Sequence, residues 1–154
     1  MNDEQPIDKM QHIAQNCASF HIRSASRLIS QVFDQHLAPT GLRGTQFSLL
    51  NALGIMDNPT VKDIAKVLTT DRTTLTRNLK PLLRDGLVVT VSGEDKRERR
   101  LALTQTGEQR LAQAMPLWEK AQEEVKGWLE PGAWPDMKAM LTTMIQTGNQ
   151  QLNT

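Results

Sequence analysis

Residues 58–104 read NPTVKDIAKVLTTDRTTLTRNLKPLLRDGLVVTVSGEDKRERRLALT, and this stretch decides the fold. Apolar residues at helical spacing predict a short helix that begins at Thr60 and, after a turn, a second helix that Gly86 ends. Apolar and β-branched runs then predict two short strands, Leu87–Val91 and Arg99–Thr104, around a loop of charged residues. Two helices joined by a tight turn and followed by a hairpin have the element order of a winged helix-turn-helix.

Both helices of this unit carry start signals. Thr60 is a typical N-cap residue, and Asp63, three residues later, suits the positive end of the helix dipole. Thr70 is the expected N-cap of the second helix, for which we predict the range Asp71–Asp85. Because Pro81 lacks an amide hydrogen and lies inside that range, we expect a bend or a tightened turn there.

The second helix has the side chains that a DNA-reading helix needs. Leu75, Leu79 and Leu82 predict one face that packs against the protein. Threonine is a mediocre helix former, so its abundance on this helix favours an outward role. Arginine can also bond two-pronged to a guanine edge. The candidate DNA contacts of this segment are Thr70, Arg72, Thr73, Thr74, Thr76, Arg77 and Lys80.

The charged loop between the strands is the predicted wing. Arg97 is expected at its tip, where a guanidinium can enter the negative potential of a minor groove. Asp95 is expected to pair with an arginine and hold the turn. Arg99 and Arg100 begin the return strand, so alternation sends one toward phosphate and the other toward the protein. The candidate DNA contacts of the wing are Lys96, Arg97 and Arg99.

The net charge of the whole chain is only +1, but its distribution is uneven. Between Val61 and Arg100 there are ten Lys/Arg and six Asp/Glu, which leaves +4 on this segment and −3 on the remainder. The positive charge therefore coincides with the segment whose predicted shape suits DNA. We expect double-stranded DNA as the partner.

Long helices are predicted on both sides of this unit. Asp8–Leu37 reads as one continuous helix, because apolar residues recur along it at helical spacing, and another helix is predicted at about Arg43–Met56. After the wing, a helix is expected from Thr106 to about Leu129, and a final helix is expected near Pro135. The apolar stripe of the first helix contains Ile13, Cys17, Phe20, Leu28 and Val32, and that of the last helix contains Met137, Met140, Leu141, Met144 and Ile145.

These terminal helices offer more apolar surface than a lone small domain can bury, so a symmetric pair of chains is expected. The predicted fold class is mainly α with a small β-wing, a winged helix-turn-helix flanked by long N- and C-terminal dimerisation helices. Residues 1–37 and 107–154 are assigned to dimerisation. Residues 38–106 are assigned to the DNA-binding lobe, and the whole forms one continuous fold.

Three parts of the chain resemble the MarR-type regulators. The wing and its exit match the family signature D-x-R … L-x-L-T-x-x-G in residues 95–97 and 101–107. The recognition helix and its end, and the join between the first two helices, are similar in residues 71–77 and 83–88 and in residues 37–42 and 46–47. The resemblance spans about Ile13 to Ile145. It implies a homodimeric transcriptional regulator, usually a repressor that a small molecule or an oxidant releases from a pseudo-palindromic operator.

The same resemblance suggests where an effector would bind. Ligands of the family often lie between the dimerisation helices and the DNA-binding lobe, and many are aromatic acids. His21, Arg23 and Arg27 are the candidate ligand residues, because an arginine can pair two-pronged with a carboxylate. Cys17, the only thiol, is the candidate for a redox sensor. We expect it to be buried and inert, since it lies on the apolar stripe and the chain has no tyrosine to hold a thiolate.

Other functions find little support in the sequence. No Ser/His/Asp order, paired carboxylates, phosphate-binding glycine loop or Cys/His metal pattern is present, so we expect neither an enzyme nor a cofactor or metal. No apolar run is long enough to span a bilayer, and the polar N-terminus is no secretory signal, which favours a cytoplasmic protein. A winged-helix module that binds only proteins remains an alternative, although its recognition face should be acidic or apolar.

Overall fold

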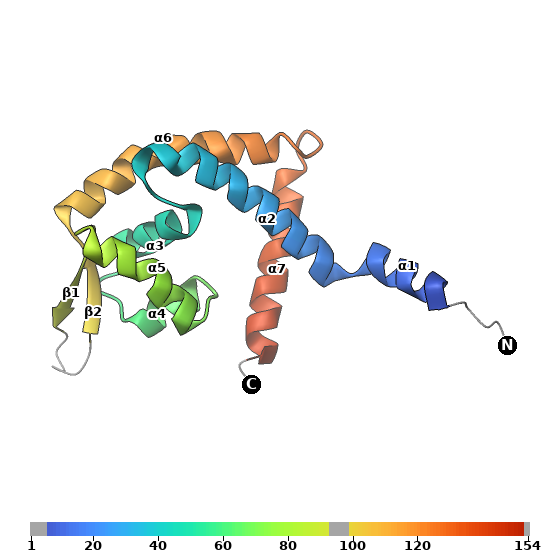
Figure 1. The fold of residues 1–154 in the computed structure, drawn as a ribbon, viewed down its shortest axis with the longest axis horizontal. Helices are drawn as coiled ribbons and strands as arrows, with labels where there is room; N and C mark the ends of the chain where they lie inside the picture. Colours follow the sequence, from blue (N-terminus) through green and yellow to red (C-terminus); the bar gives the residue numbers. More distant parts are fainter. Residues whose placement is uncertain (1–5, 93–98, 153–154) are drawn as a thin grey trace.

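The structure is a computed structural model that describes residues 6–92 and 99–152. These residues form seven α-helices and one two-stranded antiparallel sheet (Figure 1). The fold class predicted from the sequence is confirmed. The elements are α1 Pro6–Asn16, α2 Ala18–Leu37, a 3-10 turn η1 Ala38–Thr40, α3 Gly44–Ile55, α4 Val61–Val67, α5 Arg72–Arg84, β1 Val88–Ser92, β2 Arg99–Leu103, α6 Gln105–Lys126 and α7 Trp134–Leu152.

The main hydrophobic core lies inside the winged lobe, where α3, α4, α5 and the sheet meet the first half of α6. Leu75, Leu79 and Leu82 of α5 are all buried in it, as predicted. Burying a leucine side chain contributes about 1.5–3 kcal/mol relative to leaving it exposed. These three residues therefore fix the orientation of α5, and with it the direction in which the opposite face of the helix points.

Helix α4 begins with the predicted capping arrangement. The Thr60 side chain accepts a hydrogen bond from the Asp63 amide at 3.2 Å, and the Asp63 carboxylate accepts from the Thr60 amide at 2.9 Å. Hydrogen bonds from the hydroxyl and then the amide of Thr60 hold the pKa of Asp63 below its ordinary value. This reciprocal pair satisfies two of the donors that a helix start otherwise leaves free.

Helix α5 begins one residue later than predicted, because Asp71 and not Thr70 is its N-cap. The Asp71 carboxylate accepts hydrogen bonds from the Thr74 amide at 2.8 Å and from the Thr74 hydroxyl at 2.6 Å. The helix continues through Pro81 to Arg84. Gly86 then takes a left-handed conformation, with φ of 69°, which ends the helix as predicted.

The two strands form the predicted hairpin, with Val88 opposite Leu103 and Ser92 opposite Arg99. The second strand is also tied to the helix-turn-helix, since the Leu101 amide donates to the Pro59 carbonyl at 2.9 Å. The wing is therefore held by its own pairing and by the loop that precedes α4. Its direction relative to α5 is set by both.

Thr104 connects the wing to α6, which begins at Gln105, slightly earlier than predicted. Its hydroxyl donates to the Gly86 carbonyl at 2.6 Å and accepts from the Gly107 amide at 3.0 Å. The Thr104 amide also donates to the Leu87 carbonyl at 3.1 Å. One residue thus caps α6 and binds it to the turn that follows α5.

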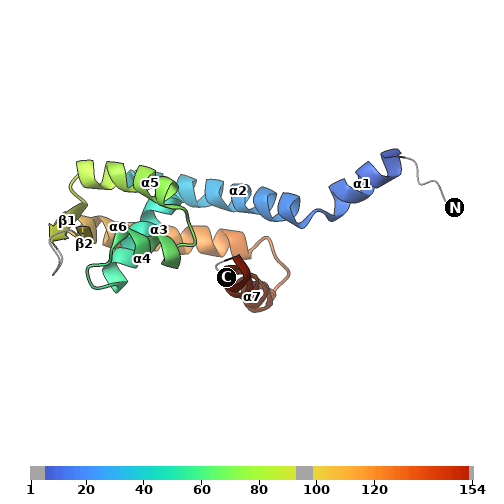
Figure 2. The same ribbon diagram turned by 90° about the horizontal axis from the view of Figure 1, so that it is seen from below.

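Helices α2 and α6 lie side by side and join the terminal segments to the lobe (Figures 1 and 2). Val32 of α2 packs with Ala121 and Val125 of α6 in a second, smaller core. His36 and Glu124 face each other across the pair, with Nε2 and Oε2 2.7 Å apart. The winged lobe is therefore joined to this packed helix pair.

The prediction of one continuous helix over residues 8–37 is wrong. Cys17 has an extended backbone, with ψ of 105°, and separates α1 from α2. The Asn16 side chain donates to the His12 carbonyl at 2.8 Å, which satisfies one of the carbonyls left free at the end of α1. Helix α1 consequently leaves the direction of α2 and projects from the body (Figure 1).

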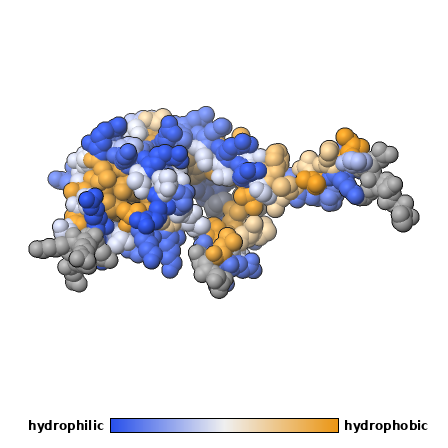
Figure 3. Space-filling model, turned by 60° about the horizontal axis from the view of Figure 1, so that its bottom comes forward, coloured by the Kyte–Doolittle hydropathy of each residue, from blue (hydrophilic) through white to orange (hydrophobic). Residues whose placement is uncertain are grey.

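The projecting helices leave most of their apolar side chains in solvent. Neither α1 nor α7 has a buried residue. Of the predicted apolar stripe on residues 8–37, only Val32 is buried, and Ile13, Phe20 and Leu28 are more than half exposed. Figure 3 shows apolar side chains gathered along α7 and along the arm formed by α1 and the start of α2. None of the described helices has the length and apolar character needed to cross a membrane.

Candidate nucleic-acid interface

The outward face of α5 gathers five of the predicted DNA-contacting residues. Positions 72, 73, 76, 77 and 80 lie opposite the buried leucines, because a helix turns once in 3.6 residues. All five side chains are exposed, and together they line one shallow hollow on the surface. We call this set the reading face; it consists of Arg72, Thr73, Thr76, Arg77 and Lys80.

The cations of the reading face lack carboxylate partners. Within residues 6–92 and 99–152, no Asp or Glu lies within ion-pair distance of Arg72, Arg77 or Lys80. Elsewhere on α5 the situation differs, since Arg84 pairs with Asp85 at 2.8 Å. This contact lowers the pKa of Asp85 and raises that of Arg84. The described part of the chain thus leaves the positive charge of the reading face without a neutralising carboxylate, which suits a phosphate-binding surface.

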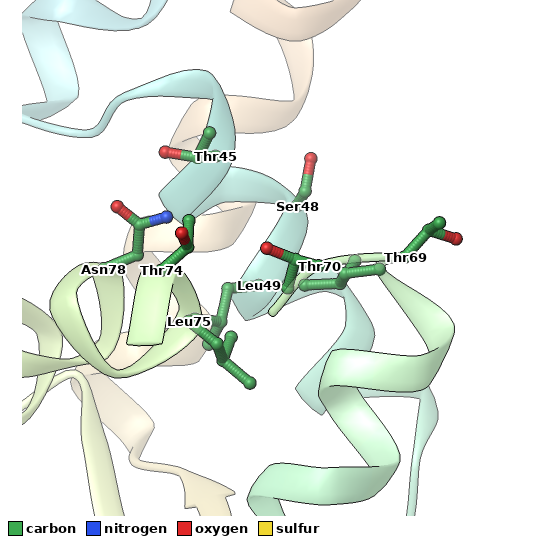
Figure 4. A pocket seen from close by; sticks show the side chains of 9 residues that line it. Thr45, Ser48, Leu49, Thr69, Thr70, Thr74, Leu75 and Asn78 are labelled. Atoms are coloured by element: carbon green, nitrogen blue, oxygen red, sulfur yellow. The ribbon is translucent and has the colours of Figure 1, made fainter. Parts of the chain in front are cut away.

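Two further residues predicted to contact DNA lie outside the reading face, namely Thr74 on α5 and Thr70 in the turn before it. Both are half-buried and border a cavity of about 290 Å³ between α3, the turn before α5 and α5 itself (Figure 4). The Thr74 hydroxyl is used by the Asp71 cap, and this bond is the main reason that the pKa of Asp71 lies below its ordinary value. Thr74 therefore positions the start of α5, and the predicted DNA contacts of Thr70 and Thr74 stay predictions.

This cavity was not foreseen from the sequence. Its lining is mostly neutral and polar, and it contains no lysine or arginine; the residues are Thr45, Ser48, Leu49, Leu68, Thr69, Thr70, Thr74, Leu75 and Asn78. Thr69 has a positive φ of 49°, which is unusual for a β-branched residue and bends the chain sharply between α4 and α5. Only the pairing of α3 with α5 brings these segments together, so no local sequence signal identifies the site.

The wing is described only at its base. Asp95, Lys96 and Arg97 lie outside the described residues, so their predicted roles remain predictions. Arg99 is exposed at the start of β2, whereas Arg100 is half-buried and donates to the Asn58 carbonyl at 3.1 Å. Arg99 thus faces outward and Arg100 bonds within the protein, as the alternation along the strand predicts. The predicted contact of Arg99 with phosphate stays a prediction.

The predicted effector residues lie on the exposed surface of α2 within a single chain. The His21 ring contacts the Cys17 carbonyl at 2.8 Å, and Arg23 donates to the Ser19 carbonyl at 3.3 Å. Arg27 is also exposed. Cys17 is half-buried rather than buried, because it lies at the break between α1 and α2 instead of inside a packed helix face.

Trp118 of α6 serves packing. Its ring stacks on Phe47, with centroids 6.1 Å apart, and contacts Phe33 at 6.4 Å. Trp118 thereby links α6 to both α2 and α3. Trp128, in contrast, is half exposed beyond the end of α6 and makes no such anchor in the single chain.

Comparison with known proteins agrees with this geometry. Residues 40–98 match the model of the MarR family. The chain is 34% identical to the uncharacterised HTH-type transcriptional regulator YwoH of Bacillus subtilis (strain 168) over 104 residues, which cover 68% of this chain and 76% of YwoH.

Solved structures of similar proteins include DNA complexes. The M. tuberculosis transcriptional regulator MosR in complex with DNA has a TM-score of 0.79 and 37% identity, covering 88% of this chain and 98% of MosR. The transcriptional repressor CouR bound to a 23-mer DNA duplex has a TM-score of 0.78 and 25% identity, covering 86% of this chain and 94% of CouR. Both likenesses include the winged lobe and the long helices beside it.

Proposed function

The chain belongs to the MarR family of DNA-binding transcriptional regulators, and we propose that it is a homodimeric repressor which a small molecule releases from a pseudo-palindromic operator. Like its relatives, it is a regulator of transcription and not an enzyme. The alternative of a winged-helix module that binds only proteins is set aside, because MosR and CouR are both bound to DNA. The dimer, the repression and the effector are the parts that need testing.

The reading face carries the proposal. Three of its residues are cations that no described carboxylate pairs with, namely Arg72, Arg77 and Lys80. They lie beside the two outward threonines on a helix that three buried leucines hold in place. A rigid helix that presents arginine and short polar side chains suits the major groove, where guanine edges and phosphates lie within reach. Exposed Arg99 at the base of the wing extends this positive surface toward the neighbouring groove.

A second copy of the chain is the proposed cover for the terminal helices. Ile13 and Phe20 on the N-terminal side, and Met140 and Met144 on α7, are each more than half exposed. Apolar faces of this extent on projecting helices are typical of interfaces rather than of free surface. A two-fold pair would place two reading faces on one side of a duplex, about one helical turn apart, and would therefore read an inverted repeat.

Repression and its release are inferred from the relatives and from the charges on α2. CouR is described as a repressor, and we extend that mode of action to this chain. The proposed effector is an aromatic acid held near His21, Arg23 and Arg27, in a pocket that the second chain would complete. The cavity beside α5 is a poor alternative for an acid, because no cation lines it.

One experiment tests the DNA-binding part of the proposal. Purified protein is incubated with a pool of random duplexes, and the bound DNA is sequenced over several rounds. We expect an inverted repeat whose half-sites are about 10 base pairs apart. Binding to it should weaken steeply with salt, with a logarithmic slope of about −5 or steeper. Recovery of no enriched sequence, together with no binding at low salt, would overturn the proposal.

The effector is tested on the operator recovered in this way. Phenolic acids and hydrogen peroxide are titrated separately into the protein–DNA complex. Release by an acid that Arg23→Ala and Arg27→Ala weaken supports the ligand pocket. Release by peroxide that Cys17→Ser abolishes supports the redox alternative, which the partial exposure of Cys17 keeps open. If neither the phenolic acids nor peroxide releases the protein from the operator, the proposal that an effector relieves repression is overturned.

A further inference from the structure

The two threonines of the reading face offer different chemical groups to a partner. Thr76 Oγ1 donates a hydrogen bond to the backbone carbonyl of Arg72, one turn earlier in α5, at 2.7 Å. Its hydroxyl is therefore folded back against the helix, as threonine hydroxyls inside helices commonly are. Because the hydroxyl hydrogen is used in this bond, the exposed Thr76 side chain has its Cγ2 methyl and the acceptor lone pairs of Oγ1 left to offer, but no donor.

Thr73 is in the opposite situation. Its side chain is exposed, and its hydroxyl makes no hydrogen bond with any part of the chain that the structure describes. That hydroxyl can both donate and accept. Residues three apart on a helix have Cβ atoms about 5–6 Å apart, which is between one and two base-pair steps of about 3.4 Å. Thr73 and Thr76 would consequently lie over neighbouring base pairs.

We propose that Thr76 selects thymine through contact between its methyl group and the thymine C5-methyl, whereas Thr73 acts through its hydroxyl. The thymine methyl is the apolar feature of the base edges exposed in the major groove, and a threonine methyl is a suitable partner for it. A reading of Thr76 through a hydrogen bond that its hydroxyl donates would require the bond to the Arg72 carbonyl to be given up. The assignment rests on the proposed function, since it places the reading face in a major groove.

The two neighbouring arginines define where that thymine lies. Arg77 follows Thr76 directly and pairs with no carboxylate in residues 6–92 and 99–152, so it can pair with a guanine or a phosphate beside the thymine. Arg72 uses only its backbone carbonyl in the bond to Thr76, which leaves its guanidinium available on the same face. The selected half-site should therefore contain a thymine whose methyl group matters for affinity.

The test removes methyl groups one at a time from the DNA. Each thymine of the selected operator is replaced in turn by deoxyuridine, which lacks only the C5-methyl, and dissociation constants are measured for each duplex. Wild-type protein should lose about fourfold in affinity at one thymine per half-site, which corresponds to about 0.8 kcal/mol for one buried methyl. If no single replacement alters the affinity of the wild-type protein, the inference is overturned.

Paired variants then assign the contact to a residue. Thr76→Val keeps an outward methyl and removes the hydroxyl, and it should retain the sensitivity to that one deoxyuridine. Thr76→Ser keeps the hydroxyl and removes the methyl, and it should bind the two duplexes equally. Thr73→Val should weaken binding to both duplexes by a similar factor. A serine variant that still discriminates, or a valine variant that does not, contradicts the assignment.

Two controls keep the results interpretable. Threonine, serine and valine have similar helix propensities, so all variants should show the wild-type circular dichroism spectrum and melting temperature within a few degrees. If one variant at position 76 fails to fold, the other still decides the question. Wild-type protein that enriches no duplex at all defeats the proposed function, whereas specific binding that ignores thymine methyl groups defeats only this inference.

Discussion

Gly107 lies directly against the backbone carbonyl of Leu87, with no room for a side chain between them. A Cβ at position 107 would come closer to the Leu87 oxygen than real Cβ atoms approach any atom. The same carbonyl accepts a hydrogen bond from the Thr104 amide at 3.1 Å, so it cannot move away without losing that bond. The close approach of Gly107 to Leu87 therefore lets the wing, the turn after α5 and the start of α6 pack together in one tight corner.

Gly107→Ala should destabilise the protein through this corner. Either α6 or the turn at Leu87 must shift, and overpacking of this kind costs about 1–3 kcal/mol or more. The melting temperature measured by calorimetry should fall, and affinity for the operator should fall with it, because the wing changes its direction relative to α5. Gly54→Ala in α3 is the matched control, since a Cβ there would meet only the side chains of Leu103 and Leu111, at ordinary van der Waals distances. Equal melting temperatures for the two variants would refute the account of the corner.

Arg77→Ala should weaken binding to the operator and relax discrimination at one base pair by about 1–3 kcal/mol, because an exposed arginine that no described carboxylate holds is available to a guanine edge. Arg97→Ala in the wing should weaken binding more evenly across sequences. Electrophoretic mobility shifts on a panel of single-base operator variants would measure both effects.

Arg84→Ala is the control for this pair, because Arg84 lies on the same helix but is bound to Asp85 and is outside the reading face. It should bind all the operator variants as the wild type does. A loss of affinity for Arg84→Ala as large as that for Arg77→Ala would mean that the reading face is misplaced on α5.

The Asp71 cap should make the stability of α5 depend on pH. Hydrogen bonds from Thr74 lower the pKa of Asp71 below its ordinary value of 3.8. A carboxyl whose pKa is depressed by folding stabilises the folded state fully above its ordinary pKa, and loses that contribution as pH falls through its lower folded pKa. Asp71→Ala should therefore melt at a lower temperature than the wild type at pH 7, and the two curves should converge below pH 3.8.

Thr74→Val offers an internal comparison for this effect, because it removes the hydroxyl bond to Asp71 and keeps the amide bond. It should show a smaller difference from the wild type of the same sign. A difference between Asp71→Ala and the wild type that stays constant from pH 7 to acid would show that the charge of the cap contributes nothing.

The winged lobe was predictable from the sequence because its signals are local. The capping pair of Thr60 with Asp63, the apolar spacing of Leu75 with Leu79, and the glycine after α5 each act within a few residues. Such signals have the same meaning in a peptide as in a folded protein. The order of elements and the outward direction of Arg77 follow from them.

The errors lie where the decisive contact is not local or where adjacent residues compete. Thr70 and Asp71 are both good N-cap residues, and the choice between them depends on the sharp turn at Thr69. No local sequence signal predicts that turn, because a positive φ is unusual for threonine. The break at Cys17 interrupts a stripe whose spacing continues across it. The cavity that Thr74 borders exists only because α3 packs beside α5.

The proposed dimer gives the last prediction. Ile145→Glu places a charge on the apolar face of α7, where the side chain is 52% exposed in a single chain. If a second copy covers that face, the variant should elute and scatter light as a monomer while keeping its helical content. Operator affinity should then fall by about a hundredfold, because linking two half-site contacts typically multiplies affinity by that factor or more.

Ile55→Glu is the matched control, because Ile55 is 78% exposed but lies at the end of α3 in the winged lobe and not on α7. The same change of charge there should leave both the dimer and operator binding intact, since exposure alone does not make an interface. Should Ile145→Glu remain dimeric at the concentrations used for binding, α7 does not form the interface, and the exposed face of α1 and the start of α2 becomes the surface that pairs.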